Sequence, residues 1–319
     1  MKGLTDIPGI RVGHASDFEA LTGCTVVLCE AGAVAGADIR GSAAGTEEFQ
    51  VMNPMHVAET VHGVVLAGGS AFGLEAAAGV RRYLERRGVG FETRAARVPI
   101  VPCAILYDLA LGRPDVRPTR EMGESTAAVA HDGPVEEGAV GAGTGASVGK
   151  LFGMSRAMKS GLGSATVPLS GVYGGVLVSA LAVVNAFGDV RNPETGQLVA
   201  GARRSSESLE LADTAREMKC GARGGFQGGN TTLVVVATNA RLTKVQVTKL
   251  AQLAQNGVAR AISPSHTMVD GDLVIALSIG AWDADVDALG VAANEATAQA
   301  VVRAARLAPG LGGLPGLRG

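Results

Sequence analysis

The chain has 319 residues, of which 47% are hydrophobic and only 3% aromatic. A chain of this length can bury a large core, and that core must consist mainly of Val, Leu, Ile and Ala. Its 28 basic and 30 acidic residues give a formal net charge of -2. This balance leaves no basic footprint for nucleic acid or for an anionic membrane, so we expect small molecules as partners.

Strand and helix patterns alternate along the chain without a repeat of fixed period, which excludes a solenoid. Apolar, β-branched runs predict strands at residues 24–30, 62–69, 175–186, 232–239 and 272–280. Apolar residues at helical spacing predict helices at residues 74–88, 205–219, 243–262 and 284–307. The alternation indicates one α/β domain over residues 1–307, with sheets buried between helical layers. The Gly/Pro/Leu-rich end, residues 308–319, is expected to be a flexible tail.

The longest uncharged stretch, residues 167–188, has the length of a membrane span. Pro168, Asn185 and several glycines divide it into pieces of strand length. Strands that are covered on both faces also appear as continuous apolar runs. We therefore predict core strands here and no contact with a membrane.

Cysteine and histidine residues give no indication of a metal site or a disulfide framework. The cysteines lack CxxC spacing, and no secretory segment follows Met1, which favours a reducing, cytoplasmic location. The histidines show no ligand spacing, so the sequence supports neither metal catalysis nor a cofactor. These residues are Cys24, Cys29, Cys103, Cys220, His14, His56, His62, His131 and His266.

Two glycine-rich segments resemble known signatures without fitting them. Centred on Ser70, GGSAF lacks the closing glycine of a nucleophile elbow. In GAGTGASVGK, residues 141–150, Thr144 replaces the first glycine of a phosphate-binding loop and Leu151 stands where Ser or Thr is needed. The same segment lacks the acidic residue that a dinucleotide site requires about twenty positions later. A turn or helix cap is the better interpretation of the segment at Ser70. For residues 141–150 the phosphate-loop interpretation fails and the dinucleotide interpretation is weak.

Residues 224–232, GGFQGGNTT, place a glycine-rich loop directly before the most strand-like run of the chain. An ordinary loop before a buried strand explains this pattern. The alternative is self-cleavage, in which the Thr231 hydroxyl attacks the Asn230 carbonyl and converts the peptide bond to an ester. Hydrolysis would leave Thr231 with a free α-amine beside its hydroxyl, combining a base with a nucleophile. Gly228 and Gly229 would supply the backbone freedom that such a shift needs.

The loop and five further segments resemble, in order along the chain, the self-cleaving N-terminal-nucleophile hydrolases of peptidase family S58. The segments are IPGIRVGH (7–14), VVLAGGSAFGLEAAAGV (64–80), VGAGTGA (140–146), MKSGLGSA (158–165), VVNAFGD (183–189) and GGNTTLVVVATNARLTK (228–244). That family includes L-aminopeptidase/D-amidase/D-esterase enzymes, β-peptidyl aminopeptidases and 6-aminohexanoate-oligomer hydrolases.

This resemblance implies an αββα sandwich that cleaves itself between Asn230 and Thr231. It implies hydrolysis of small peptides, amino-acid amides or amide oligomers through an acyl-enzyme, without a cofactor. It also implies a homo-oligomer, a tetramer of cleaved protomers.

The resemblance also assigns site residues. Thr231 corresponds to the nucleophile, Lys159 to a lysine of the nucleophile pocket, and Asn185 to an active-site asparagine. An asparagine can donate a hydrogen bond to a developing oxyanion, and a nearby positive charge favours both that oxyanion and a neutral amine. In DGD, Asp270 and Asp272 either shape a turn or face one pocket together.

The residue types favour one branch of the family. Its aminopeptidase members carry a serine nucleophile with Ser and Glu at the positions of Asp270 and Asp272. The nylon-oligomer branch carries threonine with two aspartates, and this chain resembles that branch.

Two other functions remain open at this point. Ornithine acetyltransferases have a related fold and a self-generated threonine nucleophile, so the chain could transfer acyl groups. It could also be an uncleaved, non-enzymatic binding protein on the same scaffold.

Overall fold

A computed structural model describes residues 1–224 and 229–318 of the chain. The α-helices are α1 (Glu75–Arg86), α2 (Arg120–Ala128), α3 (Thr214–Lys219), α4 (Lys244–Ala261) and α5 (Val286–Arg306). The strands of the main sheet are β1 (Arg11–Asp17), β2 (Thr22–Ile39), β3 (Gly45–Glu47), β4 (Thr60–Ala67), β7 (Cys103–Ile105), β10 (Leu162–Pro168), β11 (Leu177–Asn185), β14 (Thr231–Ala240) and β16 (Leu273–Trp282).

Short strands form three smaller sheets within the described residues. They are β5 (Phe91–Glu92) with β6 (Arg97–Val98), β8 (Ser147–Val148) with β9 (Met158–Lys159), and β12 (Asp189–Arg191) with β13 (Leu198–Ala200) and β15 (Ile262–Ser263). Single turns of 3-10 helix lie at Leu4–Asp6, Phe49–Met52, Ser70–Leu74, Gly141–Gly143, Met154–Arg156 and Gly171–Tyr173.

The main sheet has the order β10-β11-β14-β16-β2-β4-β7-β3, with β1 paired to β2. Its long strand β2 belongs to both halves, because its C-terminal half pairs with β16 and its N-terminal half with β4. The pairing with β4 is irregular between Leu28 and Ala33, and such irregularities bend a strand. One hydrogen-bonded sheet can therefore supply both layers of a sandwich.

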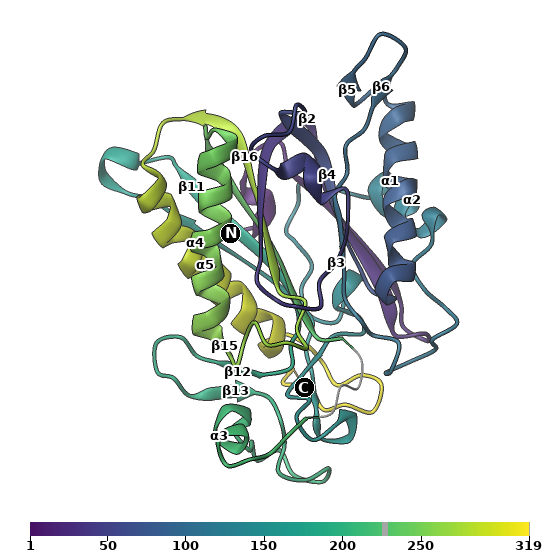
Figure 1. Cartoon of the computed structure of the whole chain (residues 1–319), viewed down its shortest axis with the longest axis vertical. Coiled ribbons are helices and arrows are strands. Elements are labelled where there is room, and N and C mark those ends of the chain that lie inside the picture. The colour runs from purple at the N-terminus through teal and green to yellow at the C-terminus, as the bar shows by residue number, and fades with distance from the viewer. Residues whose placement is uncertain (225–228, 319) are drawn as a thin grey trace.

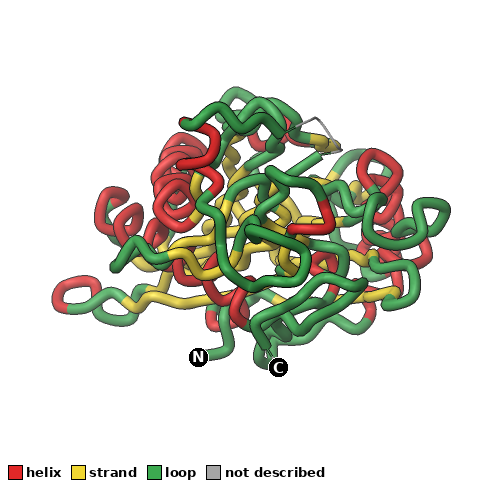
Figure 2. Tube along the Cα trace, turned by 90° about the horizontal axis from the view of Figure 1, so that it is seen from below, coloured by secondary structure: helices red, strands yellow, loops and turns green. Residues whose placement is uncertain are grey.

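Alternation along β14 shows how the layers pack. Val234 and Val236 belong to the core that contains α4 and α5, whereas Leu233 and Val235 pack in a second core with Leu66 of β4. On the far side, α1 and α2 pack on the outer face of β2 and β4. Figure 1 shows these two helix pairs on opposite sides of the strands, and Figure 2 shows the strands between them from below. The fold is the αββα sandwich that the sequence predicted.

Most of the predicted elements are present. All five predicted strands occur, as β2, β4, β11, β14 and β16, and the helices predicted at 74–88, 243–262 and 284–307 are α1, α4 and α5. The helix predicted at 205–219 is wrong for its first part, because α3 begins only at Thr214. Asp213 has a left-handed backbone (φ 63°) and caps α3 by accepting the Arg216 N–H at 3.2 Å. A helix cannot run through a left-handed residue.

The uncharged stretch 167–188 contains the end of β10 and the whole of β11. The prediction of core strands is confirmed for β11, whereas most of residues 168–175 are exposed and connect the two strands. Residues of β11 are buried on both faces, between the α4–α5 core and the sandwich interior. Of the helices in the described residues, none combines the length and hydropathy needed to span a membrane.

The segment after α5 does not meet the expectation of a flexible tail over residues 308–318. Ala308 and Leu314 are buried, and the Arg318 N–H donates to the Ala308 carbonyl at 3.1 Å. The Pro315 carbonyl accepts the backbone N–H of Lys159 at 2.9 Å. Turns rather than periodic structure satisfy this backbone, which is why helix and strand patterns did not reveal its docking.

Candidate active site

Thr231 lies at the start of β14, between β11 and β16. Asn185, the last residue of β11, is directly opposite Thr231 in the antiparallel pairing of these strands. On the other side, residues 270–272 lead into β16, which runs parallel to β14. Directly opposite residues share a face of the sheet. Thr231 and Asn185 therefore lie on the face that fills the sandwich interior, next along their strands to Leu233 and Val183.

The side chain of Thr231 is folded back on the peptide bond that precedes it. Its hydroxyl, in a residue that is 3% exposed, donates to the carbonyl oxygen of Asn230 at 2.6 Å. The same oxygen accepts the backbone N–H of Gly271, also at 2.6 Å. Two donors thus polarise the carbonyl, and the N–H of Gly271 is positioned to stabilise negative charge on its oxygen.

Asp272 holds the backbone next to the nucleophile. Its Oδ1 accepts the N–H of Thr232 at 2.7 Å, and its Oδ2 accepts the backbone N–H of His266 at 2.9 Å. Oδ2 also lies 3.0 Å from His266 Nδ1. His266 has a left-handed backbone, with φ 57°, which is uncommon for a residue other than glycine. The carboxylate links a strained loop residue to the start of β14.

Asp270 is almost fully buried, at 1% exposure. Its Oδ1 accepts the backbone N–H of Phe187 at 3.1 Å, and its Oδ2 accepts the Thr267 hydroxyl. Burial raises the pKa of Asp270 above its usual range, and the neighbouring Asp272 carboxylate raises it further. The two carboxylates of the DGD turn are therefore electrostatically coupled, and Asp270 can carry a proton at higher pH than an ordinary aspartate.

The side-chain oxygen of Asn185 accepts two hydrogen bonds. Oδ1 accepts the Ser147 N–H at 3.1 Å and the Lys150 ammonium at 2.7 Å. The Lys150 Nζ also donates to the backbone carbonyl of Asn185 at 2.9 Å. On the other side of the amide, Nδ2 donates to the Tyr107 carbonyl at 3.0 Å. An amide nitrogen has two N–H groups, so one of them is left for another acceptor.

Lys159 lies next to the turn formed by residues 143–146. It is fully buried, and its Nζ donates to the carbonyls of Gly143 (3.0 Å), Ala146 (2.8 Å) and Ser160. These three acceptors match the three N–H groups of an ammonium, although burial lowers the pKa of Lys159 to about 7. Lys159 therefore stabilises the turn before Ser147 through hydrogen bonds. The lysine that contacts Asn185 is Lys150.

A cavity of about 20 Å³ is lined by Lys150, Tyr107, Asp108 and Gly229 among others. That volume is sufficient for one water molecule. Asp108 is buried beside it, and its carboxylate accepts the Gly69 N–H at 2.7 Å and the Thr22 hydroxyl at 2.8 Å. Because Gly229 lines this cavity, the cavity lies one residue away from the Asn230–Thr231 pair.

The structure thus gathers Thr231, Asn185, Asp270 and Asp272 at the ends of three adjacent strands. Lys159 makes no hydrogen bond to these four residues and instead contacts the turn before Ser147. Gly228 lies outside the described residues. The sequence reasoning missed Lys150, Tyr107, Asp108, His266 and Gly271. Two of them stood within segments that were considered, Lys150 at the end of GAGTGASVGK and Gly271 inside DGD. No sequence signal pointed to the other three.

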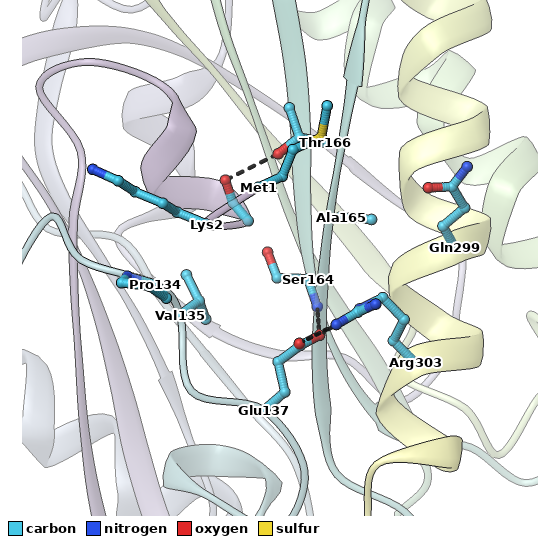
Figure 3. Close-up of a pocket in the computed structure, with 11 residues that line it drawn as sticks. Met1, Lys2, Pro134, Val135, Glu137, Ser164, Ala165, Thr166, Gln299 and Arg303 are labelled. Carbon is cyan, nitrogen blue, oxygen red and sulfur yellow. Dashed lines mark hydrogen bonds and ion pairs between the residues drawn. The ribbon is translucent and has the colours of Figure 1, made fainter.

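A larger cavity, of about 380 Å³, lies between the N-terminal segment, β10 and α5 (Figure 3). Figure 3 shows Glu137 bonded to both Ser164 and Arg303, with Arg303 Nε 2.8 Å from Glu137 Oε1. The residues gathered around Thr231 do not line it. Among the described residues, no cluster of His, Cys, Asp and Glu has the arrangement of a metal site.

Comparison with solved structures identifies the class of fold. The chain resembles a β-aminopeptidase of Burkholderia sp., with a TM-score of 0.70 at 23% identity over 99% of this chain and 90% of that one. It resembles equally the L-aminopeptidase D-Ala-esterase/amidase of Ochrobactrum anthropi, with a TM-score of 0.71 at 18% identity over 96% and 86%. The latter is described as a new variant among the Ntn hydrolase fold. The αββα sandwich is therefore of the N-terminal-nucleophile-hydrolase type.

Sequence comparison identifies the family. Residues 2–317 match the sequence model of Peptidase family S58. An uncharacterized aminopeptidase of Mycobacterium tuberculosis is 38% identical over 100% of this chain and 97% of its own length. A 6-aminohexanoate-oligomer endohydrolase of Kocuria sp. is 31% identical over 94% and 85%. The chain belongs to peptidase family S58, and it is a hydrolase of amide bonds.

Proposed function

We propose that this chain cleaves itself between Asn230 and Thr231 and then hydrolyses amide bonds with Thr231 as its N-terminal nucleophile. The observation that carries the proposal is the contact of the Thr231 hydroxyl with the Asn230 carbonyl, whose oxygen also accepts the N–H of Gly271. A loop before a buried strand requires neither contact. Together they supply the nucleophile and the oxyanion donor for an acyl shift at that bond.

Self-cleavage follows from this geometry in two steps. The Thr231 hydroxyl oxygen attacks the Asn230 carbonyl carbon, the hydroxyl proton passes to the departing nitrogen, and the C–N bond breaks to leave an ester and an amine. Water then hydrolyses the ester. The products are a carboxylate at Asn230 and a Thr231 that carries a free amine and a free hydroxyl.

Catalytic turnover uses the same atoms on a bound amide. The α-amine of Thr231 takes the hydroxyl proton as the oxygen attacks the substrate carbonyl, and it returns a proton to the leaving amine. Water hydrolyses the resulting acyl-enzyme, with the amine again as the base. Asn185 lies opposite Thr231 with an N–H available for the oxyanion, and Asp272 fixes the start of β14 through the Thr232 N–H.

Cleavage would also open the substrate site. Gly229 lines the small cavity together with Tyr107, Asp108 and Lys150 in the continuous chain. Once the Asn230–Thr231 bond is broken, the end of the first fragment can withdraw, and the acyl part of a substrate can occupy the space that Gly229 and Asn230 leave. The two fragments, residues 1–230 and 231–319, would stay together because β14 and β16 pair with β11 and β2 in one sheet.

The substrate class we propose is a small peptide, an amino-acid amide or an amide oligomer. Relatives at 36 to 38% identity are named aminopeptidases, and relatives at 30 to 31% are named 6-aminohexanoate-oligomer endohydrolases. Thr231 with Asp270 and Asp272 favours the oligomer-hydrolysing branch. We propose further that the enzyme acts in the cytoplasm as a homo-oligomer of cleaved protomers.

A denaturing gel of the purified protein tests the proposal. We expect two fragments, of 230 and 89 residues, and N-terminal sequencing of the smaller one should read TTLVV. A smaller fragment that begins at Thr232 would move the nucleophile by one residue. A single full-length band together with no hydrolysis of amino-acid anilides or 6-aminohexanoate oligomers would favour a binding protein. Transfer of the acyl group to an amino acid in preference to water would favour an acyl transferase.

A further inference from the structure

We propose that Lys150 is a positioning residue that fixes the side-chain amide of Asn185, so that its free N–H is directed at the carbonyl attacked by Thr231. This proposal rests on the proposed function of Thr231. It adds to that function a residue whose side chain, together with the backbone of Ser147 and Tyr107, decides which end of the Asn185 amide the reaction meets.

The orientation of an asparagine amide depends on its partners, because its oxygen and nitrogen are nearly equal in size. Here the two partners on one side, the Lys150 ammonium and the Ser147 N–H, are both donors. An ammonium has no acceptor capacity, and neither has a backbone N–H. The oxygen of Asn185 must therefore face Lys150, and the nitrogen must face the Tyr107 carbonyl, which is an acceptor.

The consequence for Thr231 follows from the pairing of the strands. Asn185 is directly opposite Thr231, and both side chains lie on the same face of the sheet. With its oxygen held by Lys150, the amide presents the N–H that Tyr107 leaves free. If the amide rotated, it would present an acceptor oxygen to a carbonyl that is gaining negative charge, and the interaction would become repulsive.

The backbone holds Lys150 firmly in this role. The Lys150 N–H donates to the Phe187 carbonyl, and the Gly149 N–H donates to the Gly188 carbonyl, both at 3.0 Å. The Phe187 N–H in turn donates to the Asp270 carboxylate. The turn that follows Asn185 is thus hydrogen-bonded to residues 149–150 on one side and to Asp270 on the other. This places the Lys150 side chain within hydrogen-bond distance of Asn185.

Gly149 makes this arrangement possible. Its backbone is left-handed, with φ 73°. A Cβ atom at this position would lie 1.9 Å from the Ala202 nitrogen and 2.0 Å from the Gly201 carbonyl carbon. Only glycine can adopt this conformation so close to the backbone of residues 201–202. The glycine places the next residue, Lys150, against the end of β11.

The charges near Lys150 are consistent with an ammonium at this position. Burial lowers the pKa of Lys150 to about 7, while the negative charges of Asp270 and Asp108 oppose this effect and favour its charged form. A neutral amine retains two N–H donors. Both contacts to Asn185 can therefore persist after deprotonation, and the orientation of the amide does not depend on the charge alone.

The test compares Lys150→Met with Lys249→Met, a change of the same kind at an exposed position of α4. Two rates are measured, self-cleavage on a gel and kcat per cleaved chain on an amide substrate. We expect Lys150→Met to reduce both by about tenfold to a hundredfold, since a single oxyanion donor contributes about a hundredfold or more. KM and the melting temperature should change little. Lys249→Met should behave as the wild type.

A double-mutant cycle shows whether Lys150 acts through Asn185. In an Asn185→Ala background the amide is absent, so adding Lys150→Met should cause no further loss. Asn185→Asp keeps the acceptor for Lys150 and Ser147 but has no N–H, and it should be as slow as Asn185→Ala. Following the gel over days keeps a loss of about a thousandfold measurable.

Three results would overturn the inference. They are wild-type rates in Lys150→Met, an equal loss from Lys150→Met with and without Asn185, and a rise in KM with kcat unchanged. A wild-type protein that neither cleaves itself nor hydrolyses amides would instead contradict the proposed function, so the two failures are distinguishable.

Discussion

The backbone N–H of Gly271 donates a hydrogen bond of 2.6 Å to the carbonyl oxygen of Asn230. This donor lies in the segment that leads into β16, whereas the Thr231 hydroxyl approaches the same oxygen from the first residue of β14. The bond proposed to break therefore lies where β14 begins, beside the segment that leads into its parallel neighbour β16. A change in either strand should alter its reactivity in a defined direction.

The first prediction concerns Gly271 itself. A Cβ atom there would lie 2.8 Å from the Thr231 hydroxyl oxygen and 2.8 Å from the Ala43 carbonyl oxygen. Gly271→Ala should displace the hydroxyl or the N–H and slow self-cleavage by about a hundredfold. The time course of fragment appearance on a gel measures this, with circular dichroism as the control for folding. Cleavage at the wild-type rate in a folded variant would remove Gly271 from the mechanism.

The second prediction concerns the nucleophile. Thr231→Ala should give a folded, uncleaved and inactive chain, because a methyl group cannot form the ester while little packing volume is lost. Thr231→Ser should retain part of the processing, since its hydroxyl is present. Gel analysis and an amide hydrolysis assay check both variants. Complete cleavage of the alanine variant would show that another group attacks Asn230.

The third prediction concerns the two carboxylates. Asp270→Asn and Asp272→Asn preserve much of the turn chemistry, because asparagine also bonds to nearby backbone. If the charges serve the reaction, at least one variant should lose about a hundredfold in self-cleavage or hydrolysis, with a nearly unchanged melting temperature. The Asp272 variant should be the more affected in cleavage, because Asp272 contacts the Thr232 N–H. Wild-type rates in both variants would leave DGD as a turn.

The fourth prediction concerns the pH dependence of stability. Burial lowers the pKa of Lys159 to about 7 in the folded chain, from its ordinary value of 10.5. Between these values the unfolded chain binds more protons, so the free energy of unfolding should rise as pH increases above about 7. One group contributes up to about 1.4 kcal/mol per pH unit.

Urea unfolding in the Thr231→Ala background measures this on a single uncleaved chain. The rise in the free energy of unfolding from about pH 7 to about pH 9 should be smaller once Lys159→Met is added. Lys249→Met serves as the control, because an exposed lysine has no such penalty to lose. Equal slopes with and without Lys159 would contradict the assignment.

The sequence by itself determined the parts of this protein that depend on neighbours along the chain. The run that begins at Thr231 and the helices at 243–262 and 284–307 follow from local periodicity, and the glycine loop marked the position of Asn230 and Thr231. Residues 205–213 were misassigned, because the Ala212 N–H bonds to the Ala202 carbonyl instead of forming a helical bond and Asp213 is left-handed. The tail after α5 was misassigned because turns docked against Lys159 leave no periodic pattern.

Only the tertiary structure decided which lysine meets the asparagine. Lys150 follows a glycine-rich segment and Lys159 precedes one, and the sequence offered no reason to prefer the first. Lys150 reaches Asn185 because its backbone bonds to residues 187–188, and Lys159 instead faces the carbonyls of its own neighbouring turn. Hydrogen bonds between segments 35 residues apart depend on how the sheet folds into two layers. That information is absent from local periodicity, since side-chain patterns specify which face of an element is buried and not which distant segment covers it.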